Sequence, residues 1–328
     1  AKEAFSRRGF LIVDANLHAD VYVINTCTVT NLADRKSRQY IRRMKKINPE
    51  SIIAVMGCYV QIHPDEAKSM EEIDIVLGTN EKSRLVDLVE SHLHLRQKEV
   101  NGLKQTARIK PHHELVNYEE TGVVTSIDGR SRALIKIQEG CNQYCSYCII
   151  PYARGAIRSR KESDVLKEAS VLLDAGFKEL VLTGINTALY GKEDPSNGTI
   201  QPGSLLFLLE KLNGLSGDFR IRLSSLEPTV VNAEYVKDLL SFEKLCPHLH
   251  LSLQSGSDRV LSKMNRNYNR QTYLDLVNVV RGHDRGYGLT TDVIVGFPGE
   301  TEEDFQETLD LVDQVRFQKV HVFPYSRR

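Results

Sequence analysis

The sequence lacks a long hydrophobic run, an excess of charge of either sign, and tryptophan. Without 18 or more consecutive apolar residues, it offers no helix that could span a membrane. Its 43 basic residues balance 43 acidic ones, so no global field draws the chain onto nucleic acid. No segment resembles a secretory hydrophobic region, and six cysteines in 328 residues are too sparse for a disulfide scaffold. We therefore expect a cytoplasmic enzyme with reduced thiols, long enough for two domains.

What is present is a concentrated group of cysteines. Cys141, Cys145 and Cys148 lie in the run GCNQYCSYCIIPYARG with the spacing C-x3-C-x2-C. Closed zinc and ferredoxin-type sites use four protein ligands, so this loop is one ligand short. Three thiolates could hold three irons of a [4Fe–4S] cluster and leave the fourth iron open to a substrate or cofactor. The apolar residues after the third cysteine would keep such a cluster away from water.

Two other interpretations of this loop are weaker. A zinc knuckle would need a fourth ligand, and the nearest histidines, His112 and His113, lie well upstream in a polar stretch. Disulfide pairing is disfavoured because intracellular thiols stay reduced. The spacing therefore favours an open iron–sulfur site.

The first 95 residues predict a small parallel α/β domain. Short β-branched runs alternate with helical patterns, which is typical of strands buried on both faces. The predicted strands are Asp20–Asn25, Ser51–Met56 and Ile73–Leu77, and the predicted helices are Asn31–Ile47, Pro64–Met70 and Glu81–His92. From 96 to 130 the chain is polar and without a steady period, so we expect a linker with, at most, a short hairpin.

Residues 131–328 predict six β-then-α units. The expected strands are Leu134–Gln138, Glu179–Leu182, Arg220–Leu223, His248–Leu253, Thr290–Val295 and Lys319–Phe323. The expected helices are Glu162–Ala175, Leu205–Leu212, Val230–Leu240, Arg270–Arg281 and Thr301–Val315. Repeated units of this length favour a parallel barrel, and six are fewer than the eight of a complete TIM barrel. The predicted fold is a partial (β/α)6 barrel.

Polar and glycine-rich loops follow each predicted barrel strand. The cysteine loop follows the first strand, and the runs TGIN, SSLEP, QSGS, GFPGE and PYSRR follow the others. In parallel barrels the carboxyl ends of the strands form the active-site face. A single loop of this kind is explained by turn geometry. Together the loops predict one active-site opening, with the cysteines at its edge.

These runs carry a family resemblance. The three-cysteine loop with TGIN, SSLEP, LQSGS and DVIVGFPGET resembles a radical S-adenosylmethionine (radical SAM) core. VINTCTVTN and AVMGCYVQ are similar to the amino-terminal domain of the methylthiotransferases. Asn25–Asn31 and Gln138–Asn142 most resemble the enzymes acting on threonylcarbamoyladenosine in tRNA. The isopentenyladenosine and ribosomal-protein-aspartate methylthiotransferases differ just after Cys27.

The resemblance implies roles for individual residues. Cys141, Cys145 and Cys148 would ligate a [4Fe–4S] cluster whose fourth iron binds the amino and carboxylate groups of SAM. The glycine of TGIN would allow the backbone to approach the methionine amino group, and an arginine would pair with the methionine carboxylate. Three polar side chains would contact the amino and ribose hydroxyl groups. The implied SAM-binding residues are Gly184, Glu227, Gln254, Arg266 and Asp292.

Two of the remaining cysteines, Cys27 and Cys58, each follow a predicted strand. Taken alone they would be buried structural thiols. Family members hold a second [4Fe–4S] cluster here with three cysteines, so the resemblance implies an auxiliary cluster that these two only partly supply. We expect Cys246, before the fourth barrel strand, to be structural. The family's first cysteine and its carboxy-terminal RNA-binding β-barrel are expected beyond the two ends of the sequence.

Two basic clusters are candidates for RNA phosphate contacts. One is on the predicted helix Asn31–Ile47, where a solvated surface is an equally good explanation, and the other follows the cysteine loop. Their members are Arg35, Lys36, Arg38, Arg42, Arg43, Lys45 and Lys46, and then Arg154, Arg158, Arg160 and Lys161.

The resemblance implies methylthiolation of carbon 2 of N6-threonylcarbamoyladenosine at tRNA position 37, with SAM cleaved reductively to a 5′-deoxyadenosyl radical. A radical step is suited to an aromatic C–H that no side-chain base can deprotonate. Expected partners are the tRNA anticodon stem-loop and a reductant protein such as flavodoxin or ferredoxin, with no membrane. The alternatives are a ribosomal-protein aspartate or isopentenyladenosine methylthiotransferase, or a catalytically incomplete iron–sulfur module that docks RNA.

Overall fold

The computed structural model describes residues 1–98, 104–120, 122, 131–193 and 204–327. The chain forms two compact units. The first holds the described residues of Ala1–Val124 together with Cys148–Ala156 and Arg327, and the second holds Thr125–Tyr147 and Ile157–Ser326, again where described. No helix in the described ranges is both long and apolar enough to cross a membrane.

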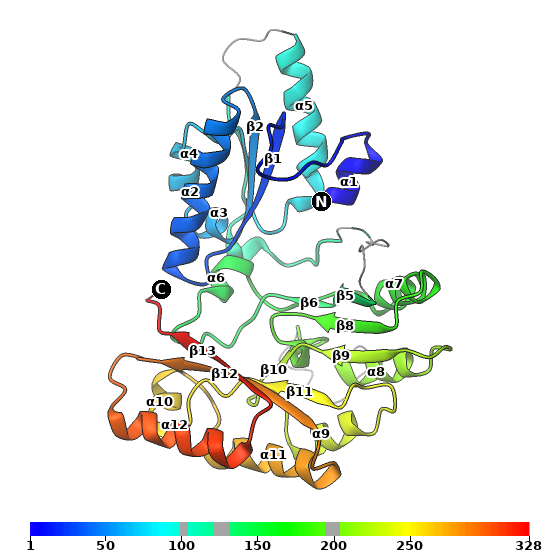
Figure 1. Ribbon diagram of the computed structural model, residues 1–328, viewed down its shortest axis with the longest axis vertical. Helices are drawn as coiled ribbons and strands as arrows, with labels where there is room; N and C mark the ends of the chain where they lie inside the picture. The colour runs from blue at the N-terminus through cyan, green and yellow to red at the C-terminus, as the bar shows by residue number, and fades with distance from the viewer. Residues whose placement is uncertain (99–103, 121, 123–130, 194–203, 328) are drawn as a thin grey trace. The chain divides into compact units, whose positions relative to one another are not determined.

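A parallel sheet forms the centre of the first unit. Its strands run in the order β1 (Val21–Thr26), β2 (Ile52–Gly57), β3 (Ile75–Leu77) and β4 (Thr106–Arg108), each parallel to its neighbour. Every residue of β2 is buried, as expected for a strand covered on both faces. Figure 1 shows this sheet between α2 (Asn31–Ile47) and α5 (Leu85–Gln97).

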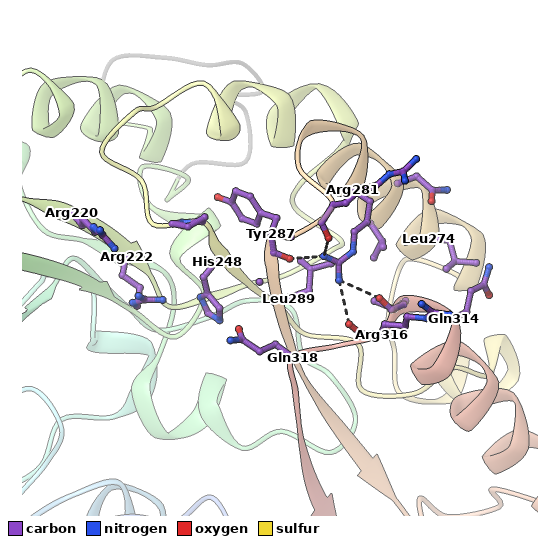
Figure 2. A pocket seen from close by; sticks show the side chains of 17 residues that line it. Arg220, Arg222, His248, Leu274, Arg281, Tyr287, Leu289, Gln314, Arg316 and Gln318 are labelled. Atoms are coloured by element: carbon purple, nitrogen blue, oxygen red, sulfur yellow. Dashed lines mark hydrogen bonds between the residues drawn. The ribbon is translucent and has the colours of Figure 1, made fainter.

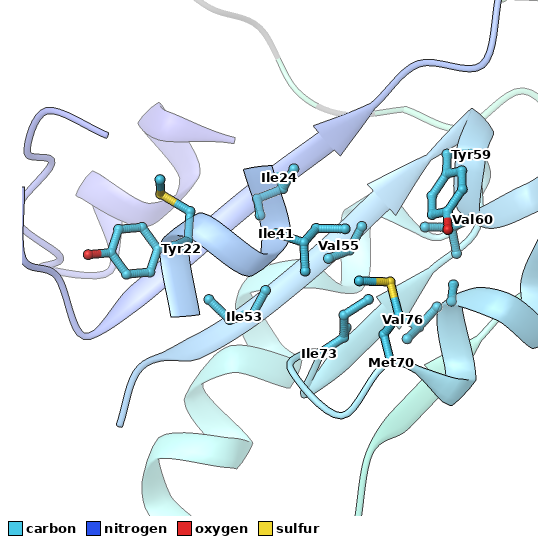
Figure 3. Packing of buried hydrophobic residues seen from close by; sticks show 12 residues of the cluster. Tyr22, Ile24, Ile41, Ile53, Val55, Tyr59, Val60, Met70, Ile73 and Val76 are labelled. Carbon is cyan, nitrogen blue, oxygen red and sulfur yellow. The ribbon is translucent and has the colours of Figure 1, made fainter. Parts of the chain in front are cut away.

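One face of this sheet packs against α2. The helix begins at Thr30, whose hydroxyl accepts a hydrogen bond from the backbone N–H of Ala33 at 3.2 Å. Ile41 and Met44 on its buried side contact side chains of the sheet, including Ile53 and Val55 (Figure 3). The other helical segments of this unit are α1 (Lys2–Arg7), α3 (Cys58–Ile62), α4 (Pro64–Ser69), η1 (Lys82–Arg84), η2 (His112–Glu114) and α6 (Ile150–Arg154).

The second unit is a curved run of parallel strands. One sheet has the order β5 (Arg132–Lys136), β8 (Glu179–Thr183) and β9 (Arg220–Leu223), and the other β10 (Ser225–Leu226), β11 (His248–Leu251), β12 (Gly288–Val295) and β13 (Lys319–Pro324). Only Ser224 separates β9 from β10, so these two form one interrupted strand. A short antiparallel pair, β6 (Gln138–Glu139) and β7 (Arg158–Ser159), follows β5.

Helices connect consecutive parallel strands, as βαβ units require. They are α7 (Glu162–Asp174), η3 (Thr187–Leu189), α8 (Leu205–Asn213), α9 (Ala233–Leu240), α10 (Asp258–Lys263), α11 (Arg270–His283) and α12 (Glu302–Val315). The expected N-cap Thr301 is confirmed. Its hydroxyl accepts the Asp304 N–H, and the Asp304 carboxylate accepts the Thr301 N–H, which makes a full capping box.

The predicted α/β class and the six barrel strands are confirmed within the described residues, with boundaries shifted by a few positions. The predicted linker over 96–130, in which the sequence allowed a short hairpin, contains a parallel strand at 106–108. Thr106–Arg108 is a fourth parallel strand, which the sequence concealed because it is three residues long and largely exposed. The rest of that linker includes 99–103, 121 and 123–130, which lie outside the described residues.

Candidate functional site

The cysteine loop leaves β6 through a glycine. Gly140 has a φ of +74°, a backbone conformation that side chains disfavour, and the next residue is Cys141. Cys141 is partly exposed and Cys145 is buried, and both belong to the second unit. Cys148 is partly exposed and begins the segment Cys148–Ala156, which belongs to the first unit. The chain thus passes from one unit to the other within the motif.

Hydrogen bonds attach this loop to the end of α10. The backbone N–H of Ser146 donates to the carbonyl of Met264 at 3.1 Å, and its hydroxyl donates to the carbonyl of Lys263 at 2.8 Å. The Asn265 amide donates to the carbonyls of Gln143 and Tyr144 at 3.3 and 3.0 Å. Asn265 itself adopts φ +58°, which asparagine tolerates better than most residues. These contacts fix the loop before any ligand binds.

Apolar packing shields the same loop from water. Tyr147 packs against Val260, Met264 and Phe297 in a small hydrophobic cluster. Burial raises the pKa of the Tyr147 hydroxyl well above its usual range. Tyr147 therefore covers one side of a loop in which Cys141 and Cys148 remain partly exposed.

Arg266 is the central cation of the site. Its side chain is buried and donates to the Cys145 sulfur at 3.4 Å, to the carbonyl of Ser252 at 3.1 Å and to the Tyr268 hydroxyl at 3.3 Å. Burial alone would lower the pKa of Arg266, but Tyr268, Tyr147, Glu227 and Cys145 around it raise it above its usual range. This contact places a fixed positive charge against the Cys145 sulfur.

Glu227 supplies the countercharge to Arg266. One carboxylate oxygen lies 2.6 Å from an Arg266 nitrogen, and the other accepts a hydrogen bond from the Thr229 hydroxyl at 3.1 Å. Burial raises the pKa of Glu227, although Arg266 and Thr229 oppose this shift. The sequence assigned these two residues separately to a bound cofactor, whereas in this structure they form a buried ion pair.

Gln138 connects the cysteine loop with the loop after β8. Its amide nitrogen donates to the carbonyls of Glu139 and Gly140, and its amide oxygen accepts from the N–H groups of Ile185 and Asn186 at 2.9 and 3.2 Å. A Cβ at Gly184 would lie 2.9 Å from that oxygen. Close contact with Gln138 is thus a sufficient reason for glycine at 184.

Gln254 has an unusual backbone. It is buried and has a φ of +69°. Its backbone N–H donates to the backbone carbonyl of Asp292 at 2.8 Å, and its carbonyl accepts the Ile294 N–H at 2.9 Å, so it pairs with β12. A buried non-glycine residue in this region is uncommon and is often found at functional sites.

A chain of polar side chains leads to Asp292. His248 Nε2 and His250 Nδ1 both lie 3.0 Å from the Thr290 hydroxyl, and His250 Nε2 lies 3.3 Å from the Asp292 carboxylate. Burial, with Arg222 and His250 nearby, lowers the pKa of His248. Sequence analysis missed both histidines, although the alternating run HLHL was a usable signal because it places them on one face of β11.

Glu139 was also missed. It is almost fully buried, immediately before Gly140, and lies 3.1 Å from the Lys136 amine and 3.6 Å from the Arg158 guanidinium. Arg158, predicted as a phosphate contact, is buried in this ion pair. The sequence shows Glu139 two residues before Cys141, but it does not show that Glu139 is buried.

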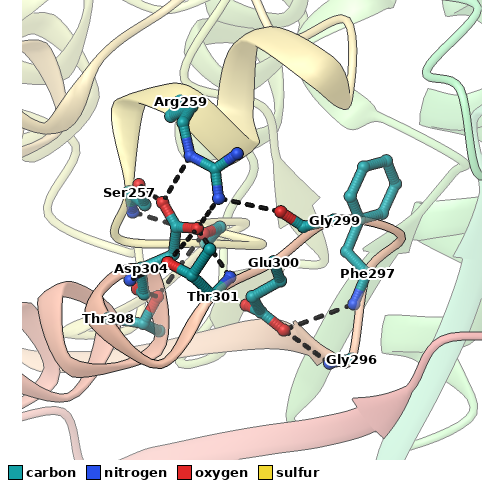
Figure 4. Close-up of polar contacts among 10 residues, drawn as sticks. Ser257, Arg259, Gly296, Phe297, Gly299, Glu300, Thr301, Asp304 and Thr308 are labelled. Carbon is teal, nitrogen blue, oxygen red and sulfur yellow. Dashed lines mark hydrogen bonds and ion pairs between the residues drawn. The ribbon is translucent and has the colours of Figure 1, made fainter.

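The GFPGE loop is held by structural contacts (Figure 4). The Glu300 carboxylate accepts the N–H groups of Gly296 and Phe297 at 2.6 and 3.3 Å. Ser257 and Arg259 both donate to Asp304, whose pKa these bonds lower. Much of the polarity in QSGS and GFPGE therefore stabilises the loops themselves.

The donor chemistry of the loop fits an iron–sulfur cluster, because thiolates are its usual ligands. Burial raises the pKa of the Cys141 thiol, and the charge of Cys145 adds to this shift, so the two sulfurs interact electrostatically. In the described parts of the chain, no three His, Cys, Asp or Glu side chains are already arranged to hold a metal ion.

The first unit places Cys27 and Cys58 at one sheet edge. Thr26 pairs with Gly57 at the ends of β1 and β2, and the two cysteines are the next residues of their chains. A Cβ at Gly57 would lie 2.5 Å from the Thr26 carbonyl oxygen, so only glycine fits before Cys58. Cys27 is exposed and Cys58 is buried. Cys246, by contrast, is buried before β11, at the other strand ends of the second unit.

Two family models match the chain. The radical SAM superfamily matches residues 135–312, and uncharacterized protein family UPF0004 matches residues 1–78.

Curated relatives match over nearly the whole chain. The chain is 42% identical to the threonylcarbamoyladenosine tRNA methylthiotransferase MtaB of Bacillus subtilis, over 99% of this chain and 69% of that protein. It is 41% identical to the Aquifex aeolicus protein of the same name, over 100% and 76%. A tRNA-2-methylthio-N(6)-dimethylallyladenosine synthase of Thermoanaerobacter is 36% identical over 98% of this chain and 66% of that protein.

Solved structures share the fold at low identity. The radical SAM methyltransferase TsrM of Kitasatospora setae, solved with tryptophan and a SAM analogue, has a TM-score of 0.61 at 17% identity, over 98% of this chain and 63% of that one. The cobalamin-dependent radical SAM enzyme OxsB with aqua-cobalamin has a TM-score of 0.60 at 14% identity, over 89% and 43%.

Proposed function

Because this chain belongs to the radical SAM methylthiotransferase family, we propose that it adds a methylthio group to carbon 2 of N6-threonylcarbamoyladenosine at tRNA position 37. The observation that carries this proposal is the 42% identity to a relative of that named activity, which extends over both units. The dimethylallyladenosine relative at 36% supports the same reaction class with a different modified adenosine.

Cys141, Cys145 and Cys148 would hold the [4Fe–4S] cluster, and SAM would complete it. When bound, this cluster supplies the electron that cleaves SAM reductively. The protein contributes a shielded loop anchored to α10 and a guanidinium beside Cys145. Arg266 would balance part of the negative charge of the cluster ligands, and Tyr147 and its neighbours would cover one side of the site.

Arg266 would pair with the methionine carboxylate of SAM, and Glu227, Gln254 and Asp292 would contact its amino group and ribose hydroxyls. The Arg266–Glu227 pair offers one positive and one negative group, the complement of a carboxylate and an ammonium. Binding of SAM would therefore separate Arg266 from Glu227, which pair with each other in this structure. Gly184 would contribute backbone only, since Gln138 occupies the space beside it.

Cys27 and Cys58 would supply two ligands of a second [4Fe–4S] cluster. The register of β1 and β2, which brings the two cysteines to the same sheet edge, supports this assignment. A second cluster near the first unit's strand ends would provide the sulfur-bearing site that methylthio transfer requires in addition to SAM cleavage.

The proposed partner is the tRNA anticodon stem-loop, and the electron donor would be a small reductant protein such as flavodoxin or ferredoxin. Exposed cations on α2 support an RNA contact, because phosphate neutralisation dominates RNA affinity. A tRNA substrate would place the reaction in the cytoplasm.

The test is an anaerobic assay of the full chain after iron–sulfur reconstitution, with SAM, dithionite and three substrates in parallel. These are tRNA carrying threonylcarbamoyladenosine, tRNA carrying isopentenyladenosine, and the ribosomal protein with its target aspartate. We expect 5′-deoxyadenosine, and methylthiolated nucleoside by mass spectrometry only from the first tRNA. Methylthiolation of either other substrate alone would reject the assignment. No 5′-deoxyadenosine from any sample would favour an iron–sulfur module that only docks RNA.

A further inference from the structure

The second unit has a cavity at the strand ends opposite the cysteine loop. It has a volume of about 710 Å³ and is lined by the first residues of β9, β11 and β12, the residue before β13, and parts of α11 and α12. Figure 2 shows His248, Leu289 and Gln318 around it. Because these are the amino-terminal strand ends, the cavity is separate from the site around Cys145 and Arg266.

Five arginines line this cavity, and none of its lining residues in the described chain is Asp or Glu. The arginines are Arg220, Arg222, Arg281, Arg285 and Arg316. Concave sites of this size commonly hold small ligands, and such a concentration of one charge sign attracts counterions. The question is which of these cations is free to bind a ligand.

Two of the five already have partners. Arg222 donates to the Glu179 carboxylate at 2.6 Å, and Arg132 shares that carboxylate at 3.1 Å. Arg281 donates to the carbonyls of Arg285 and Tyr287 at 3.0 and 2.6 Å, and to those of Val315 and Arg316 at 3.3 Å (Figure 2). Arg281 therefore joins the turn before β12 to the carboxyl end of α12 and makes one wall rigid. It also neutralises helix-end carbonyls that would otherwise repel an anion.

The other three arginines are available. Arg220, Arg285 and Arg316 are exposed and have no carboxylate partner in the described part of the chain. Glu179 is within electrostatic range of Arg220, but two closer guanidiniums already share it. Asp284, beside Arg285, uses one oxygen to accept the Gly286 N–H at 2.7 Å. The cavity thus keeps an excess of positive charge.

Arg316 has a further distinguishing feature. It ends α12 with φ +55° and ψ +62°, the left-handed position where glycine is preferred. An arginine here costs stability compared with glycine, and the structure gives its side chain no partner within the described residues that would offset this cost. Arg316 instead lines the cavity, as do Gln314 and Gln318.

We propose that this cavity binds a small ligand carrying a phosphate group. Guanidinium groups suit phosphate because their planar N–H donors match its oxygens, and the amides of Gln314 and Gln318 add neutral hydrogen bonds. Leu274, which is partly exposed, gives the cavity a small apolar part for the rest of the ligand. The lining tyrosine, Tyr287, is buried, so no exposed ring is offered for stacking RNA bases. A small phosphorylated molecule therefore fits better than an RNA strand.

The experiment is calorimetric titration of the full reconstituted chain with inorganic pyrophosphate. The test variant combines Arg285→Ala with Arg316→Gly, since glycine suits the left-handed backbone and removes the cation without strain. The matched control combines Lys167→Ala with Lys211→Ala, two exposed cations on α7 and α8. We expect the test variant to weaken binding by about tenfold or more and the control to change it by less than about twofold. Thermal unfolding of both variants verifies that they fold.

Three results would overturn the proposal. One is no binding of pyrophosphate at millimolar concentration, and another is equal weakening in the test and control variants, which would indicate only general charge attraction. The third is binding of a short single-stranded RNA that the test variant weakens and that pyrophosphate does not displace. This inference does not depend on the proposed methylthiotransferase activity, because binding is measured without SAM or tRNA.

Discussion

Arg266 lies between Glu227 and Cys145, 2.6 Å from the carboxylate and 3.4 Å from the sulfur. One buried guanidinium thus serves as the counterion of an acid and as a hydrogen-bond donor to a candidate cluster ligand. Removing it would leave the buried Glu227 carboxylate without its countercharge and the Cys145 sulfur without its hydrogen-bond donor. The site's electrostatics therefore depend on this residue more than on any other that the sequence had singled out.

Arg266→Met should destabilise the apo chain by about 3–5 kcal/mol, because it leaves the Glu227 carboxylate buried without its ion-pair partner. Urea unfolding of the cluster-free chain, compared with the wild type, measures this change. The double variant Arg266→Met with Glu227→Gln serves as the control.

In that double variant the buried charge is gone, so most of the lost stability should return. A double variant as unstable as Arg266→Met alone would show that the guanidinium acts through packing rather than through charge. The same double variant should still fail to cleave SAM, since both proposed contacts to the amino-acid group are absent.

The elements of the barrel were predictable because their signals are local. Arg220–Leu223 was predicted at its observed boundaries, and Thr301 was recognised as an N-cap from the acids that follow it. The strand Thr106–Arg108 was not predictable because it pairs with β3 through backbone groups, and two of its three side chains are exposed. Backbone pairing leaves no side-chain pattern when a strand is short and exposed.

The residues of the candidate site were predictable as a set, but their contacts were not. Spacing identified the three cysteines, and the family resemblance identified Glu227 and Arg266. The pairing of these two, the bridge made by Gln138, and the burial of Glu139 depend on contacts between distant segments. Such contacts follow from tertiary packing, so they cannot be predicted from sequence periodicity.

Substitution of Cys145 and of Cys246 should have very different effects on the iron content of the chain. We expect about four irons per chain if only the three-cysteine site assembles and about eight if both do. Cys145→Ala should remove the iron of the first site and abolish SAM cleavage. Cys246→Ala should leave iron unchanged, because this buried thiol lies at the other strand ends. Iron analysis after anaerobic reconstitution measures both, and intact SAM cleavage in Cys145→Ala would contradict the ligand assignment.

Asp304 should make the second unit sensitive to acid. Hydrogen bonds from Arg259, Thr301 and Ser257 lower its pKa, so the folded state holds the carboxylate deprotonated more strongly than the unfolded chain does. The resulting stability is present above about pH 4, the ordinary aspartate range, and is lost as the pH falls through the lower folded pKa. Asp304→Asn should therefore unfold more readily at neutral pH and lose less stability on acidification. Urea midpoints measured from neutral pH to about pH 3 test this, and parallel curves for both proteins would contradict it.

Two glycines should respond oppositely to alanine. At Gly256 a Cβ would lie 2.6 Å from the Thr308 Cα and 2.7 Å from the Glu307 carbonyl oxygen, so Gly256→Ala should cost about 1–3 kcal/mol by forcing α12 away. At Gly282, within α11, nothing lies within 4 Å of the added carbon, and Gly282→Ala should stabilise by about 0.5–1 kcal/mol. Thermal unfolding compares them, and a neutral Gly256→Ala would show that α12 can move freely.

The basic helix α2 provides the test of tRNA contact. Arg38, Arg42 and Lys45 lie 3.3, 3.6 and 3.7 Å from Glu66, Glu72 and Asp74, so these cations are already neutralised. Arg35 and Lys36 are exposed and have no ion pair within the described residues. Arg35→Gln with Lys36→Gln should weaken tRNA binding and reduce the slope of log K against log salt by about 0.7–0.9 for each lost phosphate contact.

The control for this prediction is Arg38→Gln with Arg42→Gln, which removes the same charge from the same helix. Since these two side chains are held by Glu66 and Glu72, the control should leave the salt slope unchanged even if the added negative charge lowers affinity somewhat. Equal slopes in all three proteins would show that α2 is a solvated surface. A reduced slope in the first variant alone would assign the phosphate contact to Arg35 and Lys36, because only there does the number of released counterions change.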